Sequence, residues 1–185
     1  MTGQPDPAVD EVTLRLATVS DAAAVYEINL LAWQQAYRGI LPDAYLDNLA
    51  DERAERTARW GAMLADPEPP GRVTWVVADS SDRPLGYVVV GPSRDEESAP
   101  GEGELWAIYV HPSDWRTGTG SILMGAAVGQ LGADGYTEAI LWVFEANKRA
   151  RAFYERHGWR HDGGAEIFER GGQQAIEFRY RLPLA

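Results

Sequence analysis

One stretch, residues 104–131, places the strongest constraint on how this chain folds. It reads ELWAIYVHPSDWRTGTGSILMGAAVGQL: an apolar run typical of a strand, a turn with proline, a loop that closes on Gly118 and Gly120, and the apolar spacing of a helix. A glycine-rich loop at a helix start gathers unpaired backbone N–H groups and the positive end of the helix dipole at one place. Because such a place holds phosphate without a basic side chain, the stretch predicts a pyrophosphate site.

Two common phosphate motifs do not fit this loop. A Walker A loop needs Gly-Lys-Ser/Thr at the helix start, and here Gly120 is followed by Ser121 without a lysine. The dinucleotide fingerprint needs a third glycine where Leu123 stands, although Glu138 lies where that motif places its ribose-binding acid. On these residues alone, a glycine pair that only makes a tight turn is the remaining alternative.

The rest of the chain predicts a mixed sheet with helices on its faces. Period-two alternation, apolar runs and glycine or proline breaks indicate strands at 12–16, 73–79, 85–90, 105–110, 139–144, 165–169 and 174–182, and helices that begin at Asp21, near Asp51, after Gly120 and at Asn147. The expected fold class is α+β (α/β), with a mostly antiparallel central sheet of about seven strands flanked by helices. Residues 1–10 are expected to be a disordered leader and residues 11–185 a single domain.

Two local expectations follow from the same patterns. Ser20 is expected to cap the first helix, because serine favours that position. In the last strand, Ile176, Phe178 and Tyr180 alternate with charged residues that begin at Glu177. This alternation predicts a hairpin with one buried face, formed by the apolar set.

Composition narrows the class of function. The net charge of −11 argues against nucleic acid or an anionic membrane as a partner. The chain has no cysteine, which excludes disulfides and thiolate chemistry, and its three histidines do not stand at a metal-ligand spacing, so no metal is expected. No apolar run approaches the roughly 20 residues that span a bilayer, and no signal peptide is recognisable, so we expect a cytoplasmic location.

A second motif strengthens one interpretation of the glycine loop. Residues 115–120, WRTGTG, resemble motif A of the GCN5-related N-acetyltransferase (GNAT) family, Gln/Arg-x-x-Gly-x-Gly/Ala, with Trp115 in the Gln/Arg position. Residues 147–159, NKRARAFYERHGW, resemble its motif B, N-x-x-A-x-x-F/L-Y-E-x-x-G-F/W, in register throughout. Residues 32–49 also look like the first two helices of small-molecule-type members. The resemblance therefore covers nearly the whole chain.

The resemblance implies the GNAT fold, acetyl-CoA as donor and a primary amine as acceptor. By that resemblance, the backbone of three strand residues pairs with the pantetheine arm, and loop amides wrap the pyrophosphate. A backbone N–H near Val110 would polarise the thioester carbonyl, where negative charge grows. The cofactor-binding residues that it implies are Ile108, Tyr109, Val110, Arg116, Thr117, Gly118, Thr119, Gly120, Ser121 and Asn147.

Two proton transfers are needed, because an alkylammonium (pKa about 10.4) must lose a proton and a thiolate (pKa about 8.5) gains from accepting one. Tyr154 matches the family's tyrosine that protonates the thiolate, although its spacing also suits a packed core residue. Glu104 stands where many relatives place a base, although a loop carboxylate is often merely solvated. Some relatives carry the base in the following strand, but Trp142 stands there, which leaves Glu102 and Glu145 in reserve.

Trp33 and Tyr37 lie where relatives bind the acceptor, and they equally suit the core face of the first helix. Because no cysteine offers an acyl-accepting nucleophile, the expected function is N-acetyl transfer by direct attack in a ternary complex. The acceptor is expected to be a small molecule, and the oligomeric state stays open, a homodimer included. The alternatives are a non-catalytic acyl-CoA-binding or sensor module on the same fold, and a nucleotide-binding enzyme.

Overall fold

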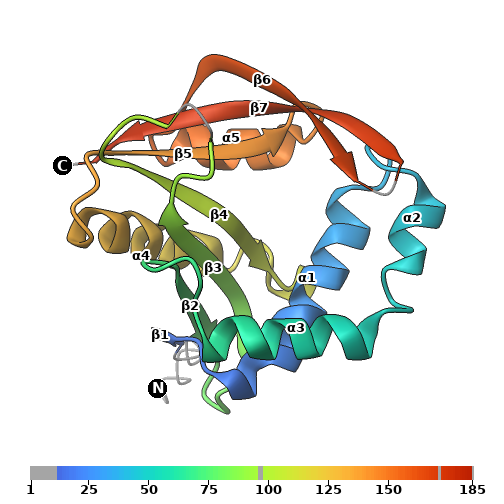
Figure 1. The fold of residues 1–185 in the computed structure, drawn as a ribbon. Helices are drawn as coiled ribbons and strands as arrows, with labels where there is room; N and C mark the ends of the chain where they lie inside the picture. The colour runs from blue at the N-terminus through green and yellow to red at the C-terminus, as the bar shows by residue number, and fades with distance from the viewer. Residues whose placement is uncertain (1–11, 96–97, 171, 185) are drawn as a thin grey trace, which may run out of the picture.

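A computed structural model describes residues 12–95, 98–170 and 172–184. The predicted disordered leader, residues 1–10, lies outside the described residues. Seven strands form one sheet in the order β1-β2-β3-β4-β5-β7-β6, and only β4 and β5 pair in parallel (Figure 1). The strands are β1 (Thr13–Leu16), β2 (Val73–Ala78), β3 (Pro84–Pro92), β4 (Glu102–Val110), β5 (Glu138–Phe144), β6 (Arg160–Arg170) and β7 (Gln173–Pro183). The expected fold class is confirmed.

Five α-helices in the described residues cover the two faces of the sheet. They are α1 (Ala22–Ala36), α2 (Asp43–Asn48), α3 (Arg53–Ala65), α4 (Thr119–Ala133) and α5 (Lys148–Arg156), with short 3-10 turns at Val19–Asp21 and Pro112–Asp114. On one face, buried Leu123 and Leu131 of α4 share a core with Tyr154 of α5. On the other face, Val25 of α1 packs with Tyr87 of β3. The sheet is therefore enclosed between α4–α5 and α1–α3.

A third apolar cluster joins the far end of the β6–β7 hairpin to the first two helices. Phe168 and Ala175 of the hairpin pack with Phe144, with Tyr26 of α1 and with Leu46 of α2. Figure 1 shows the hairpin arching above the rest of the sheet towards α2. The hairpin thus encloses one end of the space between α1 and β5.

Several local predictions need correction. Thr18, and not Ser20, precedes the first helical turn, and its backbone N–H and hydroxyl both bind the Asp21 carboxylate, at 2.7 and 3.1 Å. The periodicity alone did not indicate α2, a helix of 6 residues between Pro42 and Leu49, although the resemblance over residues 32–49 implied a second helix there; the helix predicted near Asp51 corresponds to α3. Short helices carry too little periodicity to be recognised.

The face of the last strand is also only partly as predicted. Tyr180 is fully buried, but Ile176 is 49% exposed. Glu177 instead turns to an internal cavity. The alternation was right, but the side assigned to water was wrong for this part of the hairpin, because Glu177 faces the cavity while Ile176 lies on the more exposed face. None of the helices in the described part of the chain has the length and apolar character needed to cross a bilayer.

Candidate active site

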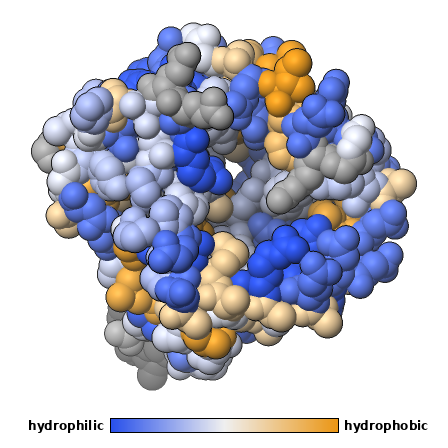
Figure 2. Space-filling model, viewed as in Figure 1, coloured by the Kyte–Doolittle hydropathy of each residue, from blue (hydrophilic) through white to orange (hydrophobic). Residues whose placement is uncertain are grey.

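The parallel strands β4 and β5 separate soon after they meet. Their register pairs only Glu102–Glu104 with residues 138–140, so the remainder of β4 has no neighbouring strand on that side. A cavity of about 1440 Å³ lies at this opening, lined by β4, β5, α1, α5 and the β6–β7 hairpin. Figure 2 shows this face of the molecule hollowed, with hydrophilic side chains in blue along much of the rim. The opening is large enough for an extended ligand.

The exposed edge of β4 offers backbone groups to this cavity. His111 N–H donates to Leu85 O of β3 at 2.8 Å, and bonding direction alternates along a strand, so the groups of Val110 and Ile108 face away from β3. The Trp115 indole N–H confirms this direction, because it donates to Val110 O from the other side at 2.8 Å. An extended ligand could therefore pair with β4 as an added strand.

The loop before α4 holds two residues with left-handed backbone. Gly118 is the N-cap with φ of 97°, and Arg116, which is not glycine, has φ of 71°. Ser121 N–H is the first amide of the helix with an internal acceptor, Gly118 O at 2.9 Å, which leaves the amides of Thr119 and Gly120 at the open helix end. A non-glycine residue at positive φ costs free energy, so the surrounding structure must hold Arg116 in this conformation. The geometry suits an anion.

Two guanidinium groups lie beside this loop. Arg149 of α5 stacks on the Trp115 ring, 3.5 Å from its centroid. Burial and the neighbouring Arg116 lower the pKa of Arg149. In the described part of the chain, no carboxylate forms an ion pair with either arginine. In a protein with net charge −11, two like cations side by side provide a local site for an anion.

Helix α5 supplies two of the residues expected at the site. The Asn147 side chain accepts a hydrogen bond from Ala150 N–H at 3.1 Å, so it caps the helix as predicted. Tyr154 is 8% exposed and lines the cavity. Burial, with smaller contributions from Tyr109 and Glu177, raises the pKa of Tyr154 well above its usual value. Its phenol therefore holds its proton at neutral pH, as a proton donor must.

Trp33 of α1 and Tyr37, which caps the end of that helix, also line the cavity. Tyr37 and Tyr109 share a hydrogen bond between their hydroxyls at 3.0 Å, which links α1 to β4. Trp33 meets Tyr37 edge-on at 5.0 Å. In the described residues, the indole N–H of Trp33 is the one buried side-chain polar group without a partner. Trp33 and Tyr37 line the cavity, as acceptor-binding residues would. They also pack with Tyr26 and Leu46 in the apolar cluster of α1 and α2, as core residues would.

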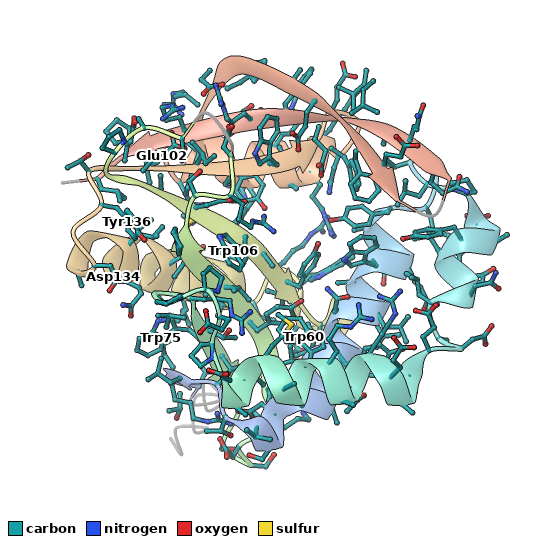
Figure 3. All side chains as sticks on the ribbon, in the orientation of Figure 1. Trp60, Trp75, Glu102, Trp106, Asp134 and Tyr136 are labelled. Atoms are coloured by element: carbon teal, nitrogen blue, oxygen red, sulfur yellow. The ribbon has the colours of Figure 1, made fainter. Side chains whose placement is uncertain are left out.

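Glu104 is held in an ion pair with Arg94. Its side chain is 2% exposed, and it accepts the Arg94 backbone N–H at 2.8 Å and Nε–H at 3.1 Å, while Nη2 makes a further contact. The Arg94 guanidinium also lies 4.6 Å above the ring of Trp106, which Figure 3 labels on β4. Glu104 lines the cavity, but these hydrogen bonds already use its oxygens.

The two reserve carboxylates lie outside the cavity lining. Glu102, labelled in Figure 3, binds Arg181 at 2.7 Å and accepts the Ser93 hydroxyl at 2.8 Å. Glu145 is exposed beyond the end of β5. No group of three or more His, Cys, Asp or Glu side chains in the described residues is arranged to hold a metal ion.

The β6–β7 hairpin adds two carboxylates that the sequence did not indicate. Glu177 lies between Phe144 of β5 and Glu166 of β6 in the strand register, and both carboxylates line the cavity. Burial, then Glu166, raises the pKa of Glu177 to about 7. In sequence, Glu177 looks like the solvent-facing member of an alternating strand, so no local pattern could identify it.

The cavity brings together nearly all of the residues expected at the site. Twelve of them line it, from α1, β4, the α4 loop and α5. Thr117 and Thr119 do not; their hydroxyls instead hydrogen-bond each other at 2.9 Å behind the loop. Sequence reasoning did not indicate Arg94, Arg149, Glu166, Phe168 and Glu177, which also line the cavity.

Comparison with protein-family models finds the Acetyltransferase (GNAT) family over residues 22–159, most of the chain. The chain belongs to this family. The matched region includes the glycine loop and α5, and it ends before the β6–β7 hairpin. The resemblance drawn from the two motifs is thereby confirmed.

Two curated relatives match along most of their length. The chain is 27% identical to the uncharacterized N-acetyltransferase YuaI of Bacillus subtilis, over 74% of this chain and 73% of YuaI. It is 28% identical to Rv2775 of Mycobacterium tuberculosis, named a probable N-acetyltransferase, over 82% of each chain.

Solved structures share the fold at lower identity. A GCN5-related N-acetyltransferase from Rhodopseudomonas palustris matches with a TM-score of 0.72 and 17% identity, over 98% of this chain and all (100%) of that one. YncA of Salmonella typhimurium, solved with its cofactor acetyl-CoA, gives 0.69 and 20%, over 95% of each chain. The PaiA N-acetyltransferase of Thermoplasma acidophilum, in complex with coenzyme A, gives 0.65 and 15%, over 90% of this chain and 98% of PaiA.

Proposed function

We propose that this chain is an acetyl-CoA-dependent N-acetyltransferase that transfers the acetyl group to a primary amine by direct attack in a ternary complex. One observation carries the proposal: a single cavity joins the glycine loop at the start of α4, an unpaired strand edge and a buried tyrosine. YncA and PaiA, which share the fold, were solved with acetyl-CoA and coenzyme A.

The donor would lie along β4. Its pyrophosphate would meet the amides of the loop from Arg116 to Gly120, while Arg149 supplies a cation nearby. Its pantetheine would pair with the outward-facing groups of Ile108 and Val110. The Val110 N–H would donate to the thioester oxygen, which gains negative charge when nitrogen attacks. Asn147, which lines the cavity, would meet the pantetheine arm.

Tyr154 would act as the acid. Its raised pKa keeps the phenol protonated until the thiolate leaves, and the sulfur then takes that proton. The absence of cysteine, the thiol nucleophile that would most readily carry the acetyl group, supports direct attack. We propose a small molecule as the acceptor and the cytoplasm as the location, with Trp33 and Tyr37 in the acceptor's wall.

Glu104, the expected base, is already engaged by Arg94. Its geometry favours a supporting role, in which it holds the loop after β3 and keeps Arg94 over Trp106.

The proposal is tested by incubating the full chain with acetyl-CoA and a panel of primary amines: n-butylamine, benzylamine, 1,4-diaminobutane and lysine amide. Free thiol and acetylated amine are measured together, and equal amounts are expected. Tight acetyl-CoA binding without transfer to any amine would instead support the acyl-CoA-binding module. A thermal shift with ATP or NAD but none with acetyl-CoA would support the nucleotide-binding alternative.

A further inference from the structure

The carboxylate best placed to take a proton in this cavity lies in the β6–β7 hairpin, outside the region that matches the family model. Three glutamates line the cavity: Glu104, Glu166 and Glu177. Glu104 is held by Arg94, and Glu166 is exposed at the rim. Glu177 differs from both because it is half-buried and its carboxylate makes no hydrogen bond or ion pair within the described chain.

The strand register orients Glu177. Ala175, which has the same parity, packs with Phe144 and Phe168 in the cluster beside α1 and α2. Tyr180, which has the opposite parity, packs against α5, where its hydroxyl donates to Glu155 at 2.8 Å. Glu177 therefore points to the acceptor end of the cavity.

The surroundings of Glu177 are mainly apolar, with a few charged groups at longer range. Phe144 and Phe168 flank it, and Tyr37 and Tyr154 both have their pKa raised partly by its charge. The titratable and charged groups that act on it or feel its charge are Glu166 of β6, Glu104 of β4, Arg94 after β3, Tyr37 of α1 and Tyr154 of α5. Glu177 and Tyr154 line the same cavity, and the charge of Glu177 contributes to the raised pKa of Tyr154.

We propose that Glu177 binds the ammonium group of the acceptor and takes its first proton, and that the acceptor is a primary amine carried on an apolar body. This inference rests on the proposed acetyl transfer. The carboxylate supplies the missing countercharge, and the aromatic walls from Trp33, Tyr37 and Phe168 enclose the apolar part.

The proposed step balances. The ammonium leaves one proton on Glu177, which passes it to solvent past Glu166 at the rim. The neutral nitrogen forms a C–N bond with the thioester carbon, the C–S bond breaks, and Tyr154 gives its proton to sulfur. The nitrogen then loses its second proton, which restores the Tyr154 hydroxyl. A base whose pKa lies near the working pH suits this step, and burial gives Glu177 a pKa of about 7.

The test compares Glu177→Gln with Glu104→Gln and with Glu169→Gln, a control for an exposed hairpin carboxylate outside the cavity lining. The quantity measured is kcat/KM for benzylamine between about pH 5.5 and 9. For the wild type it should rise with pH, with its midpoint near 7, and level off above about pH 8, where Glu177 is mostly ionised. Glu177→Gln should lower kcat/KM by about 10²–10³-fold and should remove the levelling, while Glu169→Gln changes neither.

Binding of benzylamine to the CoA complex, measured by calorimetry, gives a readout apart from turnover. Glu177→Gln should weaken it about tenfold or more while acetyl-CoA affinity stays unchanged. If Glu177→Gln retains both the wild-type rate and the wild-type levelling above pH 7, or if only Glu104→Gln removes the levelling, Glu177 is not the proton acceptor. If the wild type acetylates no amine, the proposed function fails; equal benzylamine binding by both proteins then also overturns the role of Glu177.

Discussion

The two ends of the cavity are built in different ways. At the donor end, the loop before α4 and the edge of β4 present backbone groups, and both come from one continuous stretch of sequence. At the acceptor end, side chains come from α1, the loop after β3, β6 and β7. A backbone site needs glycines at a fixed spacing and is therefore recognisable in a sequence. A side-chain site assembled from distant segments carries no such signal.

The largest effect is expected where the two ends meet, at Tyr154. Tyr154→Phe keeps the ring in its core but removes the proton that the leaving thiolate needs. We expect kcat to fall about 10²–10³-fold, with acetyl-CoA affinity within about twofold of the wild type. Tyr45→Phe in α2, outside the cavity lining, is the matched control and should retain full turnover. Turnover of Tyr154→Phe close to the wild type would show that sulfur leaves without this acid.

A second prediction tests whether Glu104 stabilises the fold rather than taking part in the reaction. Glu104→Gln removes a buried charge from its bonds with Arg94, and the Arg94 side chain is 55% exposed, which weakens the pair. We expect a loss of about 1–3 kcal/mol in the free energy of unfolding, measured by urea denaturation. The control Glu52→Gln, on an exposed α3 pair with Arg56, should lose no more than about 0.5 kcal/mol. If Glu104→Gln leaves the free energy of unfolding unchanged, Glu104 does not have this stabilising role and again becomes a candidate for the base.

The donor end should respond to a backbone change that leaves side chains alone. Gly118 has φ of 97° with nothing near its Cβ position, so Gly118→Ala strains the loop without a steric clash. That strain costs about 1–2 kcal/mol and should weaken acetyl-CoA binding about 5–30-fold in calorimetry, while amine binding stays unchanged. Gly125→Ala, in the middle of α4 and equally open, is the control and should bind normally. Equal binding by both variants would mean that the loop conformation does not hold the donor.

The smallest effect is expected from the cation beside the loop. Arg149→Gln removes one charge near the expected pyrophosphate, and we expect acetyl-CoA to bind about 3–10-fold more weakly at low salt. The difference should shrink as ionic strength rises, because salt screens a partly exposed pair. Arg59→Gln on α3, with a side chain 61% exposed, should show neither effect. A salt-independent loss would point to the stacking on Trp115 rather than to the charge.

The difference between the two ends of the cavity also explains what could be predicted from the sequence. The loop at Gly118 and the cap at Asn147 were predicted because each depends on residues within a few positions of each other. Glu177 was assigned to a polar face, because alternation identifies two faces of a strand but cannot say which one meets a cavity. Thr18 replaced Ser20 as the cap because a turn of 3-10 helix precedes α1, a detail set by the Asp21 carboxylate.

The ion pair of Glu104 with Arg94 was equally beyond reach of the sequence. The two residues lie ten positions apart on either side of a loop, and only the antiparallel register of β3 and β4 brings them together. The same holds for Arg149 and Trp115, which α5 and the α4 loop join. These contacts are determined by long-range strand register and by helix packing, and neither produces a periodic pattern in the sequence.

The most direct test is whether acetyl-CoA and the amine occupy the two ends of the cavity at the same time. It uses initial rates measured while the concentrations of acetyl-CoA and benzylamine are both varied. Direct attack in a ternary complex predicts double-reciprocal lines that intersect, with no CoA released before the amine is added. Parallel lines, together with a burst of CoA from enzyme and acetyl-CoA alone, would reveal an acetylated enzyme and would contradict the account.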